Sequence, residues 1–306
     1  MDNYSYQLND SFVLDSQQSL CPAECIALLI VLCAETVLTV TLNVLIIIVC
    51  LRETRFRKRN MYLVINLAVG DMFNGGFGLV AYLSLVNRFF QISWLNERTG
   101  SIAFLLRFLV YFFLNASVGS LAAISLERMH ATFRPLKHSL IKKRCYGVAI
   151  TAVWLTAGVI SFLFLIFFSV EGLPFFFFCY FLMILACYSS IAIKINCGRF
   201  PQRHGGGRRE RKLTKTLFIV TSASLLLALP LIICLYLSSE GSFYTSLPYR
   251  ANFYLRVCLF FLFQANSFVN PFLYTLRMPG FKRALFSLLA CKSQPTAAHV
   301  FAVNAM

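Results

Sequence analysis

Five polar side chains interrupt apolar stretches of this sequence and could together bind a cation: Asn43, Asp71, Ser117, Asn266 and Asn270. In helices that rise about 1.5 Å per residue, Asp71, Ser117 and Asn266 each lie roughly 16 Å from the polar or basic residue that ends their stretch. Asn43 and Asn270 fall close to the same depth. A carboxylate among neutral oxygens suits a hard cation such as sodium, so we expect a sodium site. The alternative is a hydrogen-bonded network that only aligns the helices.

Glu127 and Arg128 form a second candidate site, an acid and a base at the end of an apolar stretch in SLERMHATFRPL (125–136). Glu210 lies twenty residues before Pro230, which is roughly 30 Å along a helix and therefore at the same edge as Arg128. A bridge between Arg128 and Glu210 would hold two helix ends together. The alternative is that Arg128 extends towards lipid headgroups, while Glu210 belongs to the solvated charge run RRERK.

The elements that carry these residues are predicted to span a membrane. The chain has 306 residues, 58% hydrophobic and 13% charged, and its mean hydropathy is +0.72. A soluble domain carries about 25% charged residues, and a helix needs about 20 apolar residues to cross a bilayer. The sequence therefore predicts an all-α membrane protein, a seven-transmembrane helix bundle. The predicted spans are 26–50, 61–86, 103–127, 146–169, 173–195, 213–238 and 252–276.

A short amphipathic helix is predicted over 279–290, where apolar residues share one face beside Lys282 and Arg283. This segment is too short to span a bilayer and should lie in the membrane interface. We therefore divide the chain into an N-terminal tail (1–25), a transmembrane domain (26–290) and a C-terminal tail (291–306).

The positive charges predict the orientation of the bundle. Of the 28 Lys and Arg residues, 23 lie after the last span or in the loops that join the first span to the second, the third to the fourth and the fifth to the sixth, and 5 lie on the opposite side. By the positive-inside rule, the N-terminus is extracellular and the C-terminus cytoplasmic. Asn3 and Asn9 begin glycosylation sequons that such an N-tail could use. Because the basic residues form short clusters between apolar runs, we do not expect nucleic-acid binding.

Motifs in all seven spans support a family resemblance over 26–290. They are Asn43 in TLNVLIIIV, LAVGD with Asp71, SLERM with Arg128, Trp154 in AVWLTAG, Tyr188 in CYSSIAIKI, Pro230 in LALP, and NPFLY (270–274). In order and spacing, the chain resembles the rhodopsin-like (class A) G-protein-coupled receptors. This resemblance implies a plasma-membrane receptor that activates a heterotrimeric G protein when its sixth helix moves outward.

The resemblance also implies residue roles. Arg128 corresponds to the arginine that contacts the G protein in the active state and an acid in the inactive state, with Glu127 and Glu210 as the matching acids. Tyr188 and Tyr274 correspond to tyrosines that swing inward, and Pro230 to the proline that kinks helix six. Asp71, Ser117, Asn266 and Asn270 correspond to an allosteric sodium site, and Cys291 to a palmitoylated cysteine. No other cofactor is expected.

Some positions depart from the family pattern. Met129 replaces the usual tyrosine after the arginine, and Ala228 replaces the tryptophan two residues before the helix-six proline. Tyr180 stands where helix five usually has a proline, and Ala103 where helix three usually has a disulfide-forming cysteine. The lack of that proline and cysteine resembles the melanocortin, adenosine and lipid receptor branch, although NPFLY departs from the melanocortin form of the motif.

The ligand should bind between the helices on the extracellular side. Val110 stands where amine receptors carry an aspartate, which argues against an amine ligand. Arg107 and Arg256 could bind a carboxylate or phosphate, or they could extend to the outer headgroups instead. The candidate lining residues are Tyr82, Arg107, Tyr111, Asn115, Phe178, Tyr236, Arg256, Phe260 and Gln264.

The sequence therefore predicts a receptor whose partners are a heterotrimeric G protein, an extracellular ligand of unknown identity and membrane lipid, with a receptor dimer as a further hypothesis. The receptor could instead be constitutively active. Two alternatives stay open: a receptor-like scaffold or dimerisation partner that does not signal, and a membrane transporter. An enzyme is not expected, because the predicted helices do not bring together a Ser/His/Asp set, a Cys/His pair or a set of metal ligands.

Overall fold

The computed structural model describes residues 22–52, 61–90, 100–167, 173–196, 218–219, 222–223, 226–230, 233–234, 248–277 and 279–289. Its long helices are α2 (Pro22–Arg52), α3 (Met61–Phe90), α4 (Gly100–Phe133), α6 (Lys143–Phe167), α7 (Leu173–Asn196) and α9 (Tyr249–Arg277). Two short helices, α5 (Pro135–Ser139) and α10 (Pro279–Leu289), complete the elements with defined bounds. The predicted span 213–238 lies mostly outside the described residues.

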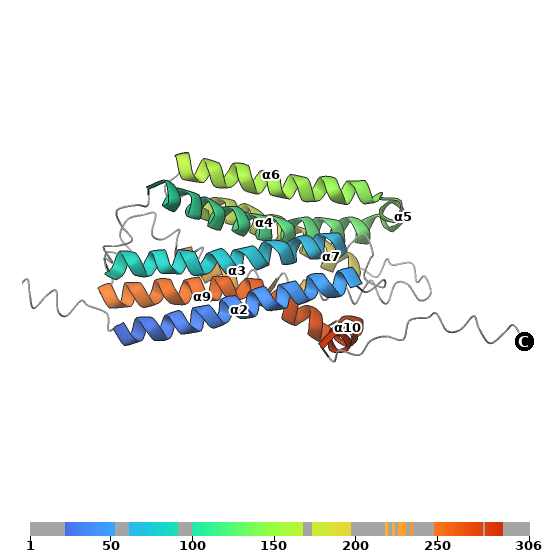
Figure 1. The fold of residues 1–306 in the computed structure, drawn as a ribbon. Coiled ribbons are helices and arrows are strands. Elements are labelled where there is room, and N and C mark those ends of the chain that lie inside the picture. Colours follow the sequence, from blue (N-terminus) through green and yellow to red (C-terminus); the bar gives the residue numbers. More distant parts are fainter. Residues whose placement is uncertain are drawn as a thin grey trace, which may run out of the picture.

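The long helices run side by side in one bundle, with α5 and α10 towards the same end (Figure 1). Helix α4 packs against α3, α6 and α7, while α2, α3 and α9 pack against one another. We call the end that holds α5 the Arg128 end, and the opposite end, where α2 begins, the Glu24 end. Helix α4, which carries Ser117 and Arg128, therefore borders three other long helices.

The distribution of side chains is that of a membrane protein. Five of the described helices are long and apolar enough to cross a bilayer, namely Ile26–Arg52, Met61–Val80, Phe104–Phe133, Lys143–Ile166 and Phe176–Lys194. Large apolar residues such as Leu155 and Val159 face outward, whereas Asn43 and Asp71 are buried. This arrangement confirms the predicted all-helical membrane bundle. Helix α9 is less apolar because its inner face carries Gln264, Asn266, Ser267 and Asn270.

Glycines in α3 allow its neighbours to approach closely. A Cβ atom added at Gly75 would lie 2.7 Å from Cγ2 of Thr39 on α2, and one added at Gly70 would lie 3.3 Å from the backbone of Ser117 on α4. Since real Cβ atoms almost never come within 3.0 Å of another heavy atom, the α2–α3 contact depends on glycine. These approaches bring Asp71 of α3 between α2, α4 and α9.

The Arg128 end is shaped by a proline and a lysine. Helix α4 ends at Phe133, and Pro135 begins α5, where its missing N–H group is not needed. Lys194 of α7 donates hydrogen bonds to the carbonyls of Thr132 (2.9 Å) and Phe133 (3.2 Å). Its charge also stabilises the negative end of the α4 dipole. The chain therefore turns back sharply, and α5 packs against α4.

Helix α10 agrees with the predicted amphipathic segment. Phe281 and Ala284 are buried in an apolar cluster with α2, α3, α4, α6 and α7, while Lys282 and Arg283 are exposed. The helix packs against α9 and α2. It therefore covers the core at the Arg128 end with one face and leaves its basic face outside.

Candidate functional site

The polar layer is built around Asp71, which is fully buried. Ser117 Oγ of α4 donates a hydrogen bond to one carboxylate oxygen, and Asn270 Nδ2 of α9 donates to the other over 2.8 Å. Three helices therefore meet at this carboxylate. The structure brings together three of the four residues predicted for the sodium site.

Further polar residues extend this layer towards the Glu24 end, and three of them, Asn74, Gln264 and Ser267, were not predicted as parts of it. Asn74 Nδ2 donates to Ser267 Oγ (3.0 Å) and to Gln264 Oε1 (3.2 Å), and Gln264 Nε2 donates to the Asn74 carbonyl (3.2 Å). Asn43 Nδ2 donates to the Ser267 carbonyl (3.0 Å). Gln264, predicted as a ligand contact, is engaged here in a link between α3 and α9.

The role predicted for Asn266, a neutral oxygen ligand of a cation, stays a prediction. Its side chain is buried, but within the described residues its Oδ1 atom has no hydrogen-bond partner, and Asp71 is bonded through Asn270 instead. The Oδ1 atom of Asn43 is likewise buried without a donor. Carboxylate, hydroxyl and amide oxygens are the kinds of ligand that a hard cation prefers, and these two amide oxygens have no donor among the described residues. The chemistry of these residues therefore fits a sodium ion.

A separate hydrogen-bonded group ties α6 to the bundle. Trp154 Nε1 donates to Asn66 Oδ1 (2.8 Å), and Asn66 Nδ2 donates to Ser120 Oγ (2.8 Å). Each of these polar atoms has a partner, which is what burial requires. This group links α3, α4 and α6 and has a structural role.

Glu35 is a buried acid that the sequence analysis missed. It lies on the inner face of α2, one turn before Thr39, and is only 7% exposed. Within the described part of the chain, its Oε1 atom is buried and has no hydrogen-bond partner. A charged residue inside a predicted span is the signal that could have found it.

The second candidate site is centred on Glu127 at the Arg128 end. Arg128 forms an ion pair with Glu127 Oε2, and His138 Nε2 of α5 lies 2.7 Å from Glu127 Oε1. Tyr146 of α6 donates a hydrogen bond to the same Oε1 atom over 3.3 Å. The structure therefore shows Glu127 as the acidic partner of Arg128 and adds His138 and Tyr146, which were not predicted.

The other predicted switch residues are placed only in part. Tyr188 of α7 is buried in the apolar cluster near α4, with its ring centroid 5.3 Å from that of Phe218. Pro230 lies in the described segment 226–230. Glu210 and the side chain of Tyr274 lie outside the described residues, so a bridge from Arg128 to Glu210 stays a prediction. Asn3, Asn9 and Cys291 also lie outside them.

The predicted ligand residues divide into an inner and an outer group. Tyr82 is buried, and Asn115 Nδ2 donates to Ser161 Oγ over 3.2 Å and to the Tyr111 carbonyl over 2.9 Å. Arg107 is exposed. Tyr236 lies outside the described residues. The inner residues therefore belong to the packing between helices at the Glu24 half of the bundle.

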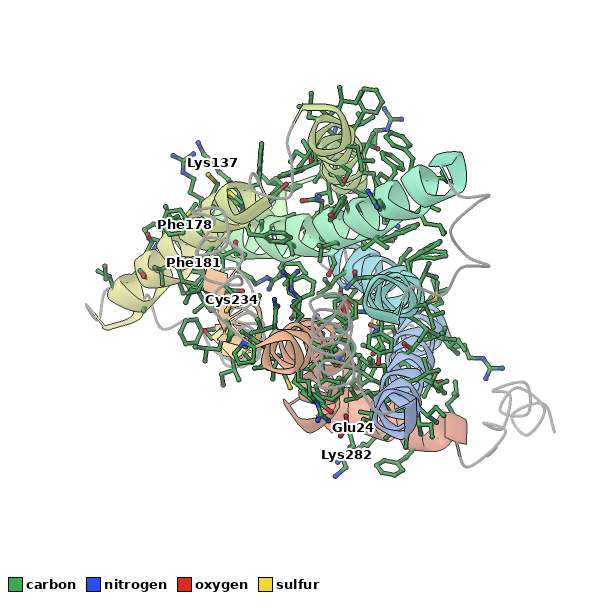
Figure 2. The ribbon with its side chains drawn as sticks, turned by 90° about the vertical axis from the view of Figure 1, so that its left-hand side faces the viewer. Glu24, Lys137, Phe178, Phe181, Cys234 and Lys282 are labelled. Atoms are coloured by element: carbon green, nitrogen blue, oxygen red, sulfur yellow. The ribbon has the colours of Figure 1, made fainter. Side chains whose placement is uncertain are left out.

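Phe178 was predicted to line the ligand site, but its side chain faces outward. It is 51% exposed and points away from the bundle axis (Figure 2), whereas its neighbour Phe177 is only 5% exposed and packs inside. Successive residues of a helix point about 100° apart, so a shift of one position moves a side chain from the core to the surface. Phe177, with a ring centroid 6.1 Å from that of Phe263 of α9, is the inward residue.

Arg256 and Phe260 of α9 lie at the Glu24 half. Arg256 Nε donates to Asn252 Oδ1 over 2.8 Å, and Phe260 packs against the cluster of Leu32, Tyr82, Phe253 and Val257. Arg256 therefore lies about one helical turn from both Phe253 and Phe260 along α9.

An ionic clasp joins α2 and α9 at the Glu24 end. Arg250 donates to both carboxylate oxygens of Glu24 over 3.0 Å, and Tyr254 donates to one of them. The hydrogen bond to Glu24 and the charge of that residue raise the pKa of Arg250. The charge of Arg250 is therefore paired with that of Glu24, and this pairing sets Arg250 apart from Arg107 and Arg256.

Comparison with known proteins agrees with this arrangement. Residues 42–174 match the family model of the 7 transmembrane receptor (rhodopsin family), and residues 164–283 match that of the serpentine type 7TM GPCR chemoreceptor Srv. The chain is a rhodopsin-like G-protein-coupled receptor. As members of this family do, the receptor spans the plasma membrane several times and activates a heterotrimeric G protein in response to a signal.

The chain is similar to two receptors that are named for lipids and to one that is named for an amine. The receptor is 26% identical to the human lysophosphatidic acid receptor 1 over 281 residues, covering 82% of this chain and 72% of that receptor. It is 26% identical to the zebrafish (Danio rerio) sphingosine 1-phosphate receptor 1 over 287 residues, covering 81% and 74%. It is also 28% identical to the Drosophila melanogaster octopamine receptor beta-2R over 123 residues, covering 40% and 22%.

Proposed function

We propose that this receptor responds to a small ligand with an anionic head and an apolar body. The observation that carries the proposal is Arg256, which donates a hydrogen bond to Asn252 and lies about one helical turn from Phe253 and Phe260 of an apolar cluster at the Glu24 half of the bundle. Arg107, exposed on α4, supplies a second positive charge at that half. An arginine fork suits a phosphate or carboxylate, and an aromatic cluster suits an acyl chain. Similarity to receptors named for lysophosphatidic acid and sphingosine 1-phosphate supports this choice.

In this proposal, the Glu24 end faces the extracellular side and the Arg128 end faces the cytoplasm. The excess of Lys and Arg in the segments at the Arg128 end supports this orientation. The N-tail (1–25) would then be outside, with Asn3 and Asn9 available for glycosylation. The C-tail (291–306) would be inside, where Cys291 could carry a lipid.

Activation follows as a shift between two states. In the inactive state, Arg128 is held by Glu127, and we propose a second restraint from Glu210 on the sixth helix. Ligand binding favours a state in which the sixth helix pivots outward at Pro230, Tyr188 and Tyr274 move inward, and Arg128 contacts a G-protein helix. The extent of the shift is limited by the ligand's difference in affinity for the two states.

We also propose that Asp71, Ser117 and Asn270, with the Oδ1 atom of Asn266, hold a sodium ion that favours the inactive packing. The buried carboxylate supplies the charge, and the hydroxyl and amide oxygens supply neutral ligands. Surrounding membrane lipid and a receptor dimer are further predicted partners.

The ligand proposal is tested with a panel of phosphorylated lipids and their dephosphorylated counterparts. Membranes that contain the receptor and a purified heterotrimeric G protein are treated with lysophosphatidic acid, sphingosine 1-phosphate, monoacylglycerol or sphingosine. We expect a phosphorylated lipid to accelerate nucleotide exchange and its counterpart to be inactive. Arg256→Ala and Arg107→Ala should each raise the half-maximal concentration by roughly 10- to 100-fold, since each loses a charge-assisted hydrogen bond.

Arg250→Ala is the matched control, because Glu24 already uses the charge of Arg250. This variant should keep the half-maximal concentration within about threefold, since exposed ion pairs contribute little. Equal potency of a phosphorylated lipid and its dephosphorylated counterpart would refute an anionic head group. So would an unchanged response in both arginine variants.

A further inference from the structure

Glu127 has a basic group on each of its two carboxylate oxygens. Arg128 pairs with Oε2, and His138 Nε2 lies 2.7 Å from Oε1. The Glu127 side chain is 9% exposed, that of Arg128 6% and that of His138 23%. The acid is thus almost sealed from water, while the histidine keeps a route for exchange of a proton with solvent.

The fold brings His138 to this place through the break between α4 and α5. Eleven residues separate Glu127 from His138, and the turn at Arg134 and Pro135 directs α5 back against α4. An ionised carboxylate only accepts hydrogen bonds, so the 2.7 Å contact requires a hydrogen on His138 Nε2. The charged imidazolium and one of its neutral tautomers both satisfy this requirement.

The two forms of His138 differ in what they allow Arg128 to do. When Arg128 leaves Glu127, a neutral His138 leaves a buried carboxylate without a compensating charge, which is strongly unfavourable. A charged His138 keeps that carboxylate paired after Arg128 has left. Protonation of the histidine therefore lowers the free energy needed to release Arg128.

We propose that His138 is a positioning residue for the G-protein switch. In its charged form, His138 stays paired with the Glu127 carboxylate, and Arg128 can then leave Glu127. Histidine is the kind of side chain whose ordinary charge change falls between about pH 5 and pH 8, so the proposal predicts that the switch depends on the pH of the cytoplasm. The inference rests on the role proposed for Arg128.

Other titratable groups surround His138. The His130 ring of α4 has its centroid 5.9 Å from that of His138, and within the described residues its Nδ1 atom is buried without a partner. The Tyr146 hydroxyl of α6 lies 3.4 Å from His138 Nε2. The charged residues nearest in the chain are exposed: Arg134, Lys137, Lys142, Lys143 and Arg144. His130 is the neighbour whose titration must be separated from that of His138.

The test measures nucleotide exchange by a G protein on membranes with the full-length receptor, between about pH 6 and pH 8. We expect basal exchange by the wild type to rise as pH falls, by roughly tenfold, the effect of one charge-assisted hydrogen bond. His138→Gln keeps a donor without a charge and should give low exchange at every pH. His138→Arg carries a permanent charge and should give high exchange at every pH, whereas His130→Gln should follow the wild type.

A second measurement does not depend on the G protein or on a ligand. Hydrogen exchange of the α5 amides is compared between wild type and His138→Gln at each pH, which removes the intrinsic pH dependence of exchange. We expect protection by the wild type to exceed that of the variant increasingly as pH falls. A constant ratio would overturn the inference even if His138→Arg did not fold.

The two measurements also separate this inference from the role proposed for Arg128. A pH-dependent protection ratio with pH-independent nucleotide exchange would overturn the link from His138 to Arg128. A pH slope of nucleotide exchange that His138→Gln retains and His130→Gln loses would assign the effect to His130 and overturn the inference as well.

Discussion

At the scale of single residues, the molecule buries many polar groups within the bundle and exposes many large apolar groups on its outside. Asp71 and Asn74 have hydrogen-bond partners on neighbouring helices, because water cannot replace such a partner within a bilayer. Glu35 departs from this rule, since its Oε1 atom has no partner among the described residues. A buried polar group without a partner lowers stability, so residues of this kind point to function or to sites that substitution can improve.

Glu35→Gln should make the receptor more stable. The amide has nearly the same shape as the carboxylate and removes a buried, unpaired acid, so the free energy of unfolding should rise by about 1–3 kcal/mol. Thermal melting of the purified receptor measures the change. Glu24→Gln is the matched control: it loses the ion pair with Arg250 and should leave the melting temperature nearly unchanged, because exposed ion pairs contribute little to stability. A lower melting temperature for Glu35→Gln would show that the acid has a partner in the native state.

Asp71→Asn should remove sodium binding. The wild-type melting temperature is expected to be higher in sodium chloride than in choline chloride of equal ionic strength, because a ligand that binds the folded state stabilises it. The variant should show no such difference, since it lacks the carboxylate. Ser120→Ala, which removes a hydroxyl bonded to Asn66 rather than to Asp71, should keep the sodium effect. A sodium effect that persists in Asp71→Asn would contradict the cation site.

At the scale of elements, close packing of α3 positions the polar layer. Gly75 faces Thr39 of α2, and the position of a Cβ at Gly78 lies 1.7 Å from Gln264 Nε2 of α9. Glycine normally lowers the stability of a helix interior. At these two positions, however, its small size lets α2 and α9 approach α3.

Gly75→Ala should therefore destabilise the receptor by about 1–3 kcal/mol, because the added methyl group overlaps the Thr39 side chain and forces the helices apart. Gly76→Ala provides the comparison, since no heavy atom outside its own helix lies within 4 Å of the added Cβ. That variant should be neutral or more stable by up to about 1 kcal/mol. Equal melting temperatures for the two variants would show that α2 and α3 do not depend on this contact.

Most helices could be predicted from the sequence, because apolar runs long enough to span a bilayer are typical of transmembrane helices. Their ends could not: α4 was expected over 103–127 but continues to Phe133, since hydrogen bonding continues past the charged Glu127 and Arg128. The depth of polar residues was also predictable from the helical rise. Their direction around the helix was not, which is why Phe178 was wrongly placed inside.

The contacts within the candidate sites were likewise predictable only in part. Asp71, Ser117 and Asn270 were predicted to meet, and they do. The contact of His138 with Glu127 could not be predicted, because it crosses the break between α4 and α5, where helical periodicity no longer relates sequence distance to position. The two partners, Glu127 and His138, are eleven residues apart on different helices.

At the scale of the whole molecule, two polar centres sit at different depths of one helix bundle. Helix α4 connects them, because it carries both Ser117 of the Asp71 layer and Arg128 of the proposed switch. A change in the packing of α3, α4 and α9 around Asp71 would therefore reach Arg128 through a continuous helix. This arrangement suits a receptor that responds at one end and acts at the other.

The most direct test of the account is nucleotide exchange by a panel of purified heterotrimeric G proteins on membranes that contain the receptor, with and without phosphorylated lipids. We predict that the receptor accelerates exchange by at least one heterotrimer above the rate on receptor-free membranes. Glu210→Ala should raise the basal rate, and Arg128→Ala should lower it. If a correctly folded receptor accelerates exchange by none of the heterotrimers under any of these conditions, the account of Arg128 as the switch of a signalling receptor is contradicted.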